Sequence, residues 1–109
     1  MVDTMPEADV IDKEFLLKHR SKIQKMFTEG AETKKVEMRK ITKDHLYPQI
    51  AGKSNAANAK KFIAGMEKNG LGKIEEFEGR PCFKLIDFEN ANAEELDLCK
   101  EIGVFENNN

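Results

Sequence analysis

Residues 54–85 read SNAANAKKFIAGMEKNGLGKIEEFEGRPCFKL, and this stretch decides the fold. Ser54 or Asn55 can cap the start of a helix, and Asn69-Gly70 supplies a left-handed stop at its end. Four apolar side chains fall within about 100° of one another on the helix circumference, namely Ala59, Phe62, Ile63 and Met66. The opposite side holds Ala57, Lys60, Lys61, Ala64 and Lys68, with Glu67 at its edge. The sequence therefore predicts a helix through Lys68 that is buried on one side and basic on the other.

The remainder of the stretch predicts a β-hairpin. Leu71 to Glu78 is typical of a strand, Gly79-Arg80 of a turn, and Pro81 to Asp87 of the returning strand. The apolar faces of this hairpin come from Ile74, Phe77, Phe83 and Leu85.

The chain before residue 54 predicts two further helices and a short strand. A long helix begins at Asp9 or Asp12 and ends before Gly30, with one face made of Ile11, Phe15, His19, Ile23, Met26 and Phe27. A polar loop over residues 30–35 leads to a short strand over residues 36–41. Thr42 caps a second short helix that carries Leu46, Tyr47 and Ile50 and is kinked or cut short by Pro48.

A last helix is predicted from Glu94 to Ile102. Asn90 or Asn92 can cap it, Glu94 and Glu95 favour its N-terminal dipole, and Gly103 can end it. It is amphipathic, with Leu98, Ile102 and Phe105 on one side and Leu96 and Cys99 nearby. Residues 1–8 and 106–109 are expected to be a disordered leader and a disordered tail.

The charges are sorted along the chain although the formal net charge is only −2. Residues 10–84 carry 17 Lys and Arg against 10 Asp and Glu, a local balance of +7. Residues 1–9 have a balance of −3, and residues 85–109 have a balance of −6. A basic middle between acidic ends indicates binding to a polyanion or to a charged partner, the alternative being chance sorting on a solvated surface.

The order helix, short strand, helix, turn, helix, hairpin resembles the winged-helix variant of the helix-turn-helix superfamily. Three segments between about Val36 and Ile86 carry the resemblance. They are Ile41-Thr42 with Leu46 and Ile50, then Phe62-Ile63 through Leu71, then the hairpin from Gly72-Lys73-Ile74 through Glu78-Gly79-Arg80 to Phe83-Lys84-Leu85. We assign no narrower family.

The resemblance implies an α+β fold with three helices, a C-terminal hairpin wing and an additional C-terminal helix. Residues 9–88 would form the winged-helix domain and residues 89–105 the acidic C-terminal helix.

The resemblance also implies that the third helix enters the major groove of duplex DNA while the wing touches an adjacent groove or the backbone. Lysine side chains would neutralise phosphates, the amides of Asn55 and Asn58 could pair with adenine, and Arg80 would contact the backbone or the minor groove. Asn55 has an alternative role as a helix cap, and Asn58 as a flanking residue. The predicted nucleic-acid-binding residues are Lys53, Asn55, Asn58, Lys60, Lys61, Lys68 and Arg80.

These features predict an intracellular, nuclear or cytoplasmic, DNA-binding domain with modest sequence specificity that acts in transcription regulation or chromatin control. Glu75, Glu76 and Glu78 in the wing oppose contact with phosphates and leave two alternatives open. One is a protein-interaction module on the same scaffold, and the other is an RNA-associated winged helix. The acidic C-terminal helix could complete the core, compete with nucleic acid for the lysines, or bind a protein partner.

The residue inventory argues against an enzyme. His19 and His45 stand apart, and Cys82 and Cys99 are too far apart in sequence for a metal-binding pair. Because the first residues lack the basic and apolar regions of a secretory signal, reduced thiols are expected. Gly70-Leu71-Gly72 ends a helix, whereas a phosphate loop needs glycines that open one. We therefore expect no catalytic residues, no metal and no cofactor, and no apolar run is long enough to cross a membrane.

Overall fold

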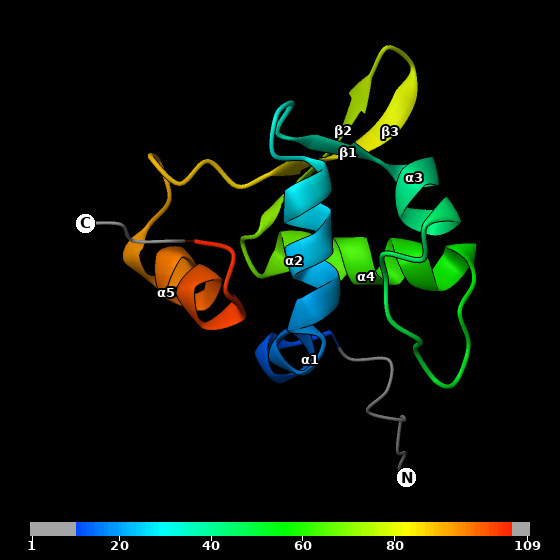
Figure 1. The fold of residues 1–109 in the computed structure, drawn as a ribbon, viewed down its shortest axis with the longest axis horizontal. Helices are drawn as coiled ribbons and strands as arrows, with labels where there is room; N and C mark the ends of the chain where they lie inside the picture. The colour runs from blue at the N-terminus through cyan, green and yellow to red at the C-terminus, as the bar shows by residue number, and fades with distance from the viewer. Residues whose placement is uncertain (1–10, 106–109) are drawn as a thin grey trace, which may run out of the picture.

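The computed structural model describes residues 11–105, which form an α+β fold of five helices and one three-stranded sheet (Figure 1). In chain order the elements are α1 (Lys13–Lys18), α2 (Arg20–Glu29), β1 (Lys35–Glu37), α3 (Met38–Lys43), α4 (Ala56–Lys68), β2 (Gly72–Phe77), β3 (Arg80–Leu85) and α5 (Ala93–Ile102). The sheet is antiparallel with the order β1-β3-β2. The leader, the tail and the alternative cap Asp9 lie outside the described residues.

The N-terminal helix is broken, whereas the sequence pattern predicted one continuous helix. Asp12, one of the two residues predicted to begin this helix, caps α1. Its side chain accepts a hydrogen bond from the Phe15 N–H at 2.9 Å. The helix then breaks at His19, whose backbone (φ −112°, ψ 33°) is not helical, and α2 leaves in a new direction (Figure 1). The break lets α1 pack against α5 and buries Leu16, which the single-helix pattern did not select.

The segment after β1 differs from the prediction more strongly. Helix α3 follows β1 without a loop, so Thr42 lies inside a helix and its hydroxyl donates back to the Met38 carbonyl at 3.0 Å. The predicted helix after Thr42 is therefore wrong. Residues 44–55 form a loop whose apolar side chains Leu46, Tyr47 and Ile50 are nonetheless buried. Positive φ angles at His45 (54°) and Ala51 (56°), with Pro48 between them, prevent a helix there.

Helix α4 has the predicted boundaries and orientation. Asn55 accepts the Asn58 N–H at 3.0 Å, and Gly70 turns the chain after Asn69 with φ of 85°. The predicted inner side chains are fully buried in a core shared by all helices and the sheet. The largest members of that core include Leu16, Ile23, Met26, Ile41, Ile50, Phe62, Ile63, Met66, Leu71, Phe83 and Ile102.

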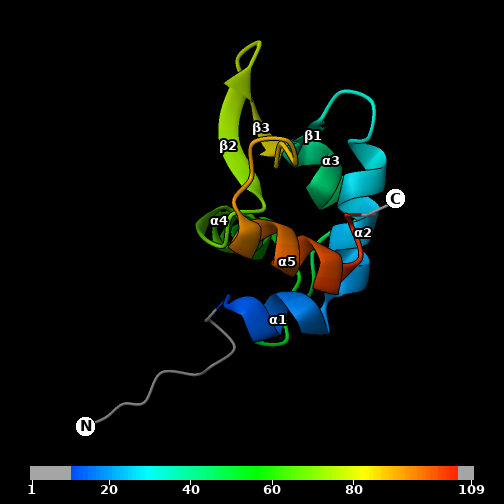
Figure 2. The same cartoon turned by 90° about the vertical axis from the view of Figure 1, so that its left-hand side faces the viewer.

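The hairpin is present, but its turn is Glu78-Gly79 and not Gly79-Arg80. Both turn residues have positive φ (54° and 80°), as a two-residue type I′ turn requires, and Phe77 pairs with Arg80 across it. Phe83 and Leu85 are buried as predicted. Both views show the hairpin projecting beyond the helices (Figures 1 and 2).

Helix α5 begins and ends as predicted. Asn92 and Glu95 form a reciprocal capping box, and Gly103 ends the helix with φ of 94°. Its apolar side chains Leu98, Cys99 and Ile102 are buried in the common core. The Gln24 side chain on α2 also donates to the Ile102 carbonyl at 2.6 Å. Of the alternatives for this acidic segment, the structure places it in the core.

Two further sequence expectations concern the thiols and the membrane. Cys82 and Cys99 are both free and buried, the first in the sheet and the second on α5. Among the described residues, no helix combines the length and the apolar character that crossing a bilayer requires.

Truncating Phe62 should test the importance of the inner side of α4. Its ring is completely buried, with its centroid 6.4 Å from that of Phe15. We expect Phe62→Ala to lower the free energy of unfolding by about 3–5 kcal/mol, because a cavity remains where the ring was. Urea denaturation measures this change. The exposed neighbour Ala64→Ser is the control, and equal stability of the two variants would contradict this assignment of the core.

The turn residue Glu78 should be replaceable with a gain in stability. Glutamate is disfavoured at φ of 54°, whereas asparagine tolerates this left-handed region and is preferred in type I′ turns. We expect Glu78→Asn to raise the free energy of unfolding by about 0.5–1 kcal/mol. Thermal denaturation checks this, with exposed Glu76→Asn as the control. A lower melting temperature for Glu78→Asn would exclude the I′ turn.

Candidate nucleic-acid interface

The outward side of α4 carries the basic surface that the sequence predicts. Lys60, Lys61 and Lys68 are all exposed, and Lys53 is exposed in the loop that precedes the helix. Ala57 and Ala64 are also exposed and leave the helix backbone accessible between the lysines. In Figure 2, α4 lies at the edge of the molecule, and the hairpin rises from the same edge. The structure therefore places a lysine-bearing helix beside a projecting hairpin.

Glu67, the single carboxylate within α4, is tied to the hairpin. Its Oε2 accepts the backbone N–H of Ile74, on the outer edge of β2, at 3.0 Å. The connection between α4 and β2 is short, because only Asn69, Gly70 and Leu71 separate the two elements. Glu67 therefore helps to set the angle between α4 and the hairpin. Helical periodicity placed Glu67 at the edge of the basic side but gave no signal for this contact.

Asn58 does not lie on the basic surface, although the sequence predicted that its amide contacts a base. Asn58 is only 7% exposed to solvent. Its side-chain amide donates to the Ile50 carbonyl at 3.0 Å and to the Lys53 carbonyl at 2.9 Å. Both donors of the amide are used to hold the preceding loop against α4. Asn58 therefore has a structural role, and we leave it out of the interface.

Asn55 is exposed, but its side-chain oxygen serves as the cap of α4. Capping orients the carbonyl of the amide toward the helix and leaves the N–H₂ group as the end that can reach a ligand. Asn55 can therefore donate hydrogen bonds outward. Bidentate recognition of adenine also needs the side-chain oxygen as an acceptor, and that oxygen is free only if the cap is broken.

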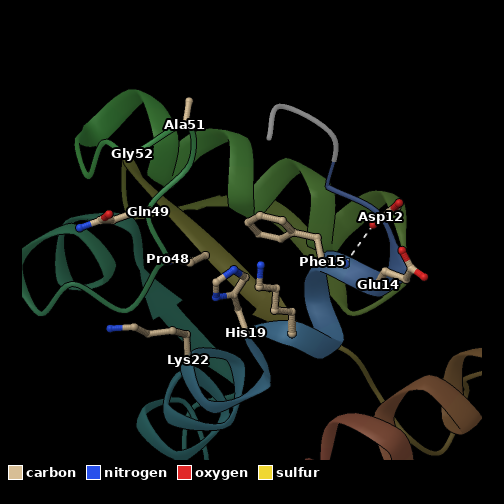
Figure 3. A pocket seen from close by; sticks show the side chains of 10 residues that line it. Asp12, Glu14, Phe15, His19, Lys22, Pro48, Gln49, Ala51 and Gly52 are labelled. Carbon is tan, nitrogen blue, oxygen red and sulfur yellow. Dashed lines mark hydrogen bonds between the residues drawn. The ribbon is translucent and has the colours of Figure 1, made fainter. Parts of the chain in front are cut away.

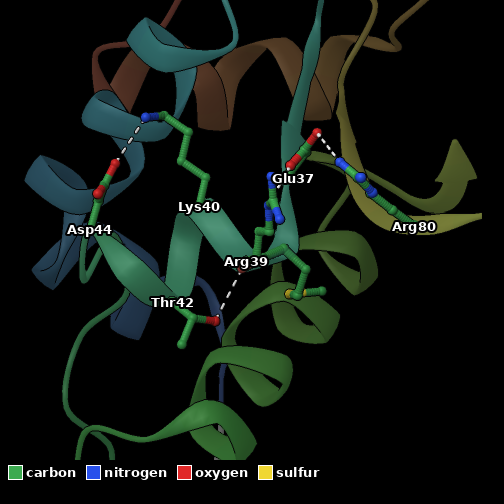
Figure 4. Close-up of polar contacts among 7 residues, drawn as sticks. Glu37, Arg39, Lys40, Thr42, Asp44 and Arg80 are labelled. Atoms are coloured by element: carbon green, nitrogen blue, oxygen red, sulfur yellow. Dashed lines mark hydrogen bonds and ion pairs between the residues drawn. The ribbon is translucent and has the colours of Figure 1, made fainter. Parts of the chain in front are cut away.

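Arg80 lies at the start of β3 and reaches sideways across the sheet. Its Nη1 is 3.9 Å from Glu37 Oε2, and the other oxygen of Glu37 accepts from Arg39 Nε at 3.1 Å (Figure 4). The Arg80 side chain remains 58% exposed. An exposed ion pair of this kind contributes at most about 1 kcal/mol, so it does not prevent Arg80 from turning toward a phosphate.

Helix α3 has basic side chains that are partly neutralised. Lys40 Nζ lies 3.0 Å from Asp44 (Figure 4) and 3.3 Å from Glu29. Hydrogen bonds to Asp44 and Glu29 raise the pKa of Lys40, and the hydrogen bond from Lys40 lowers the pKa of Asp44. These pairs keep Lys40 charged. Helix α3 carries three basic side chains and no acid of its own, but carboxylates from neighbouring segments partly offset its charge by pairing with Arg39 and Lys40.

An open cleft of about 740 Å³ lies between the α1–α2 break and the loop of residues 48–52 (Figure 3). Lys18 and Lys22 line it, while Asp12 and Glu14 line it as well and offset their charge. Lys22 Nζ already donates to the His45 carbonyl at 3.0 Å. Burial, and then the charges of Lys18 and Lys22, lower the pKa of His19, so this imidazole is neutral at neutral pH. The cleft therefore has no strong preference for an anion.

The chain also contains possible metal ligands and two cysteine thiols. Within residues 11–105, no three His, Cys, Asp or Glu side chains are placed to hold a metal ion. Burial, and then the nearby Glu95, raise the pKa of Cys99 to about 11. Burial, and then Glu37, also raise the pKa of Cys82. Both thiols are therefore protonated at neutral pH and are poor nucleophiles.

Removing the buried amide of Asn58 should destabilise the loop before α4. We expect Asn58→Ala to lower the free energy of unfolding by about 1–2 kcal/mol, because two buried carbonyls lose a donor. Urea denaturation measures the loss, and amide hydrogen exchange should become faster at Lys53. Lys60→Ala, two residues along the helix, is the control. A similar result for the two variants would argue against the structural role of Asn58.

Comparison of the chain with protein-family models, with curated proteins and with solved structures found no match.

Proposed function

We propose that this chain is a winged-helix-type domain that binds nucleic acid through α4, with duplex DNA as its preferred ligand. The observation that carries the proposal is the sorting of charge on α4. Three exposed lysines occupy its outward side, and its one carboxylate, Glu67, is held at the hairpin. A phosphate backbone would meet positive charge along this helix and little opposing charge.

The arrangement of the elements supports the same proposal. From β1 to β3, the elements follow one another along the chain as β1, α3, α4 and the β2–β3 hairpin. Within the sheet, β3 is the central strand, with β1 on one side and β2 on the other. This order resembles a winged helix with α4 in the position of the groove-binding helix. The major groove of DNA is about 12 Å wide and accepts a helix of about 10–12 Å diameter, which the small side chains of Ala57 and Ala64 assist.

The expected contacts predict affinity with modest sequence specificity. Lys53, Lys60, Lys61 and Lys68 are positioned to bind phosphates, which carry no sequence information. Asn55 offers only the outward end of its amide, and Asn58 is buried. A general, salt-dependent mode of binding follows, of the kind that suits chromatin or transcriptional control in combination with a second specificity factor.

A protein-interaction module is the second candidate function. Glu75, Glu76 and Glu78 are exposed on the hairpin that would act as the wing, and they would repel a phosphate backbone. The hairpin therefore contributes little to the nucleic-acid proposal, which depends on α4 and the loop before it.

Charge reversal on α4 tests the proposal. The double change Lys60→Glu with Lys61→Glu should weaken binding to a short DNA duplex. The negative slope of log K against log salt concentration should also become shallower by about two units. Fluorescence anisotropy at several salt concentrations measures both quantities. Duplex RNA and single-stranded DNA of matched length identify the preferred nucleic acid.

The matched control is Lys25→Glu with Lys100→Glu, which makes the same change in net charge on α2 and α5. This control should retain most of the affinity and the salt slope. If both double variants lose affinity equally, α4 is not the interface. If the unmodified protein binds none of the three nucleic acids at low salt, the protein-module alternative replaces the proposal.

A further inference from the structure

Two large apolar side chains are exposed within residues 11–105, and both lie on strand β2. Ile74 is 41% exposed and Phe77 is 46% exposed. Cross-strand pairing puts Ile74 on the same sheet face as Phe83 and puts Phe77 on the opposite face with Arg80. Because the hairpin projects beyond the helices (Figure 2), its distal half has no protein layer to bury either side chain.

Strand β2 is also an edge strand, because the sheet order is β1-β3-β2. Phe77 and Arg80 close a two-residue turn, so Phe77, Glu75 and Lys73 direct their backbone groups toward β3. Ile74 and Glu76 direct theirs outward. Glu67 accepts the Ile74 N–H. The Ile74 carbonyl and the N–H and carbonyl of Glu76 then remain available for hydrogen bonds to a further strand. At the end of the strand near α4, the Ile74 N–H is already occupied by Glu67.

The charge on this strand selects the kind of partner. Glu75 and Glu76 lie between the two exposed apolar side chains, and Glu78 follows them. Antiparallel pairing of two β2 strands from separate copies, centred on Glu75 or on Glu76, would set identical carboxylates directly opposite each other, which is destabilising. A basic strand would meet opposite charge instead. Phe77 already accepts a cation, since Lys35 Nζ lies 3.7 Å from its ring centroid.

We propose that the outer edge of β2 binds an extended basic segment of a partner protein as a fourth strand of the sheet. Residues opposite Ile74, Glu75, Glu76 and Phe77 would follow the order apolar, basic, basic, apolar, because directly opposed side chains interact most strongly. This order reads the same in both directions, so it holds for a parallel or an antiparallel strand. The surface lies beside the lysine side of α4, and the proposal does not depend on nucleic-acid binding.

A pair of synthetic peptides tests the proposal on the full chain. The first is acetylated and amidated, has valine, lysine, lysine, valine at its centre, and has serines on both sides. The second has lysine, valine, valine, lysine and therefore the same composition and charge. Fluorescence anisotropy should show binding of the first at least about tenfold tighter than of the second. Hydrogen exchange of the Glu76 amide should become slower when the first peptide binds.

Variants of β2 then separate strand addition from general charge attraction. Ile74→Ala and Phe77→Ala should each weaken binding of the first peptide severalfold, whereas Lys60→Glu with Lys61→Glu should not weaken it. Glu75→Lys with Glu76→Lys should reverse the preference toward a peptide with valine, glutamate, glutamate, valine. Circular dichroism confirms that each variant is folded.

Three results would overturn the proposal. They are equal affinity for the two lysine peptides, unchanged exchange at Glu76, and the absence of binding to the first peptide. Equal affinity would mean that only charge is recognised. None of these results bears on nucleic-acid binding by α4, so the two proposals can fail separately.

Discussion

The burial of one side of α4 is the constraint on which the rest of the structure depends. Phe62, Ile63 and Met66 face the centre of the core and fix the orientation of the helix about its own axis. Once those side chains are inside, the 3.6-residue period forces Lys60, Lys61 and Lys68 outward. The basic surface is therefore a consequence of packing as much as of composition. Any change that rotates α4 would remove the lysines from their common side.

The local signals in the sequence were reliable where they agreed with one another. Caps, stops and periodicity all gave the same boundaries for α4 and α5, and the structure has Asn55 and Asn92 as the two caps. Prediction failed where one pattern fitted two structures. The spacing of Leu46, Tyr47 and Ile50 suits a helical face, but these side chains reach the core from a loop that bends at residues with positive φ. Apart from Pro48, which interrupts a helix, no local pattern distinguishes these two ways of burying them.

The site shows the same division between local and tertiary information. A helical wheel was sufficient to place the exposed lysines, because exposure on α4 follows directly from which side is buried. It was not sufficient for Asn58, since an amide near a helix start is usually exposed, whereas this one satisfies carbonyls of a loop whose course was mispredicted. Strand alternation likewise assigned Ile74 and Phe77 to the apolar faces of the hairpin, but it gave no signal that both are exposed. Their exposure follows from how far the hairpin projects, which depends on the length of β1 and the positions of the helices.

The two proposed surfaces meet at one hydrogen bond. Glu67 belongs to α4, and its carboxylate accepts the N–H of Ile74 on the outer edge of β2. That single contact removes a negative charge from the lysine side of the helix and occupies a donor that would otherwise extend the open edge of the sheet. Breaking it would release the carboxylate beside Lys68 and would lengthen the unpaired edge toward α4. Because edge strands pair readily with other chains, a carboxylate that caps the edge also limits where an added strand can begin. The same residue therefore affects the charge distribution of one surface and the length of the open edge at the other, although the bond itself is exposed and individually weak.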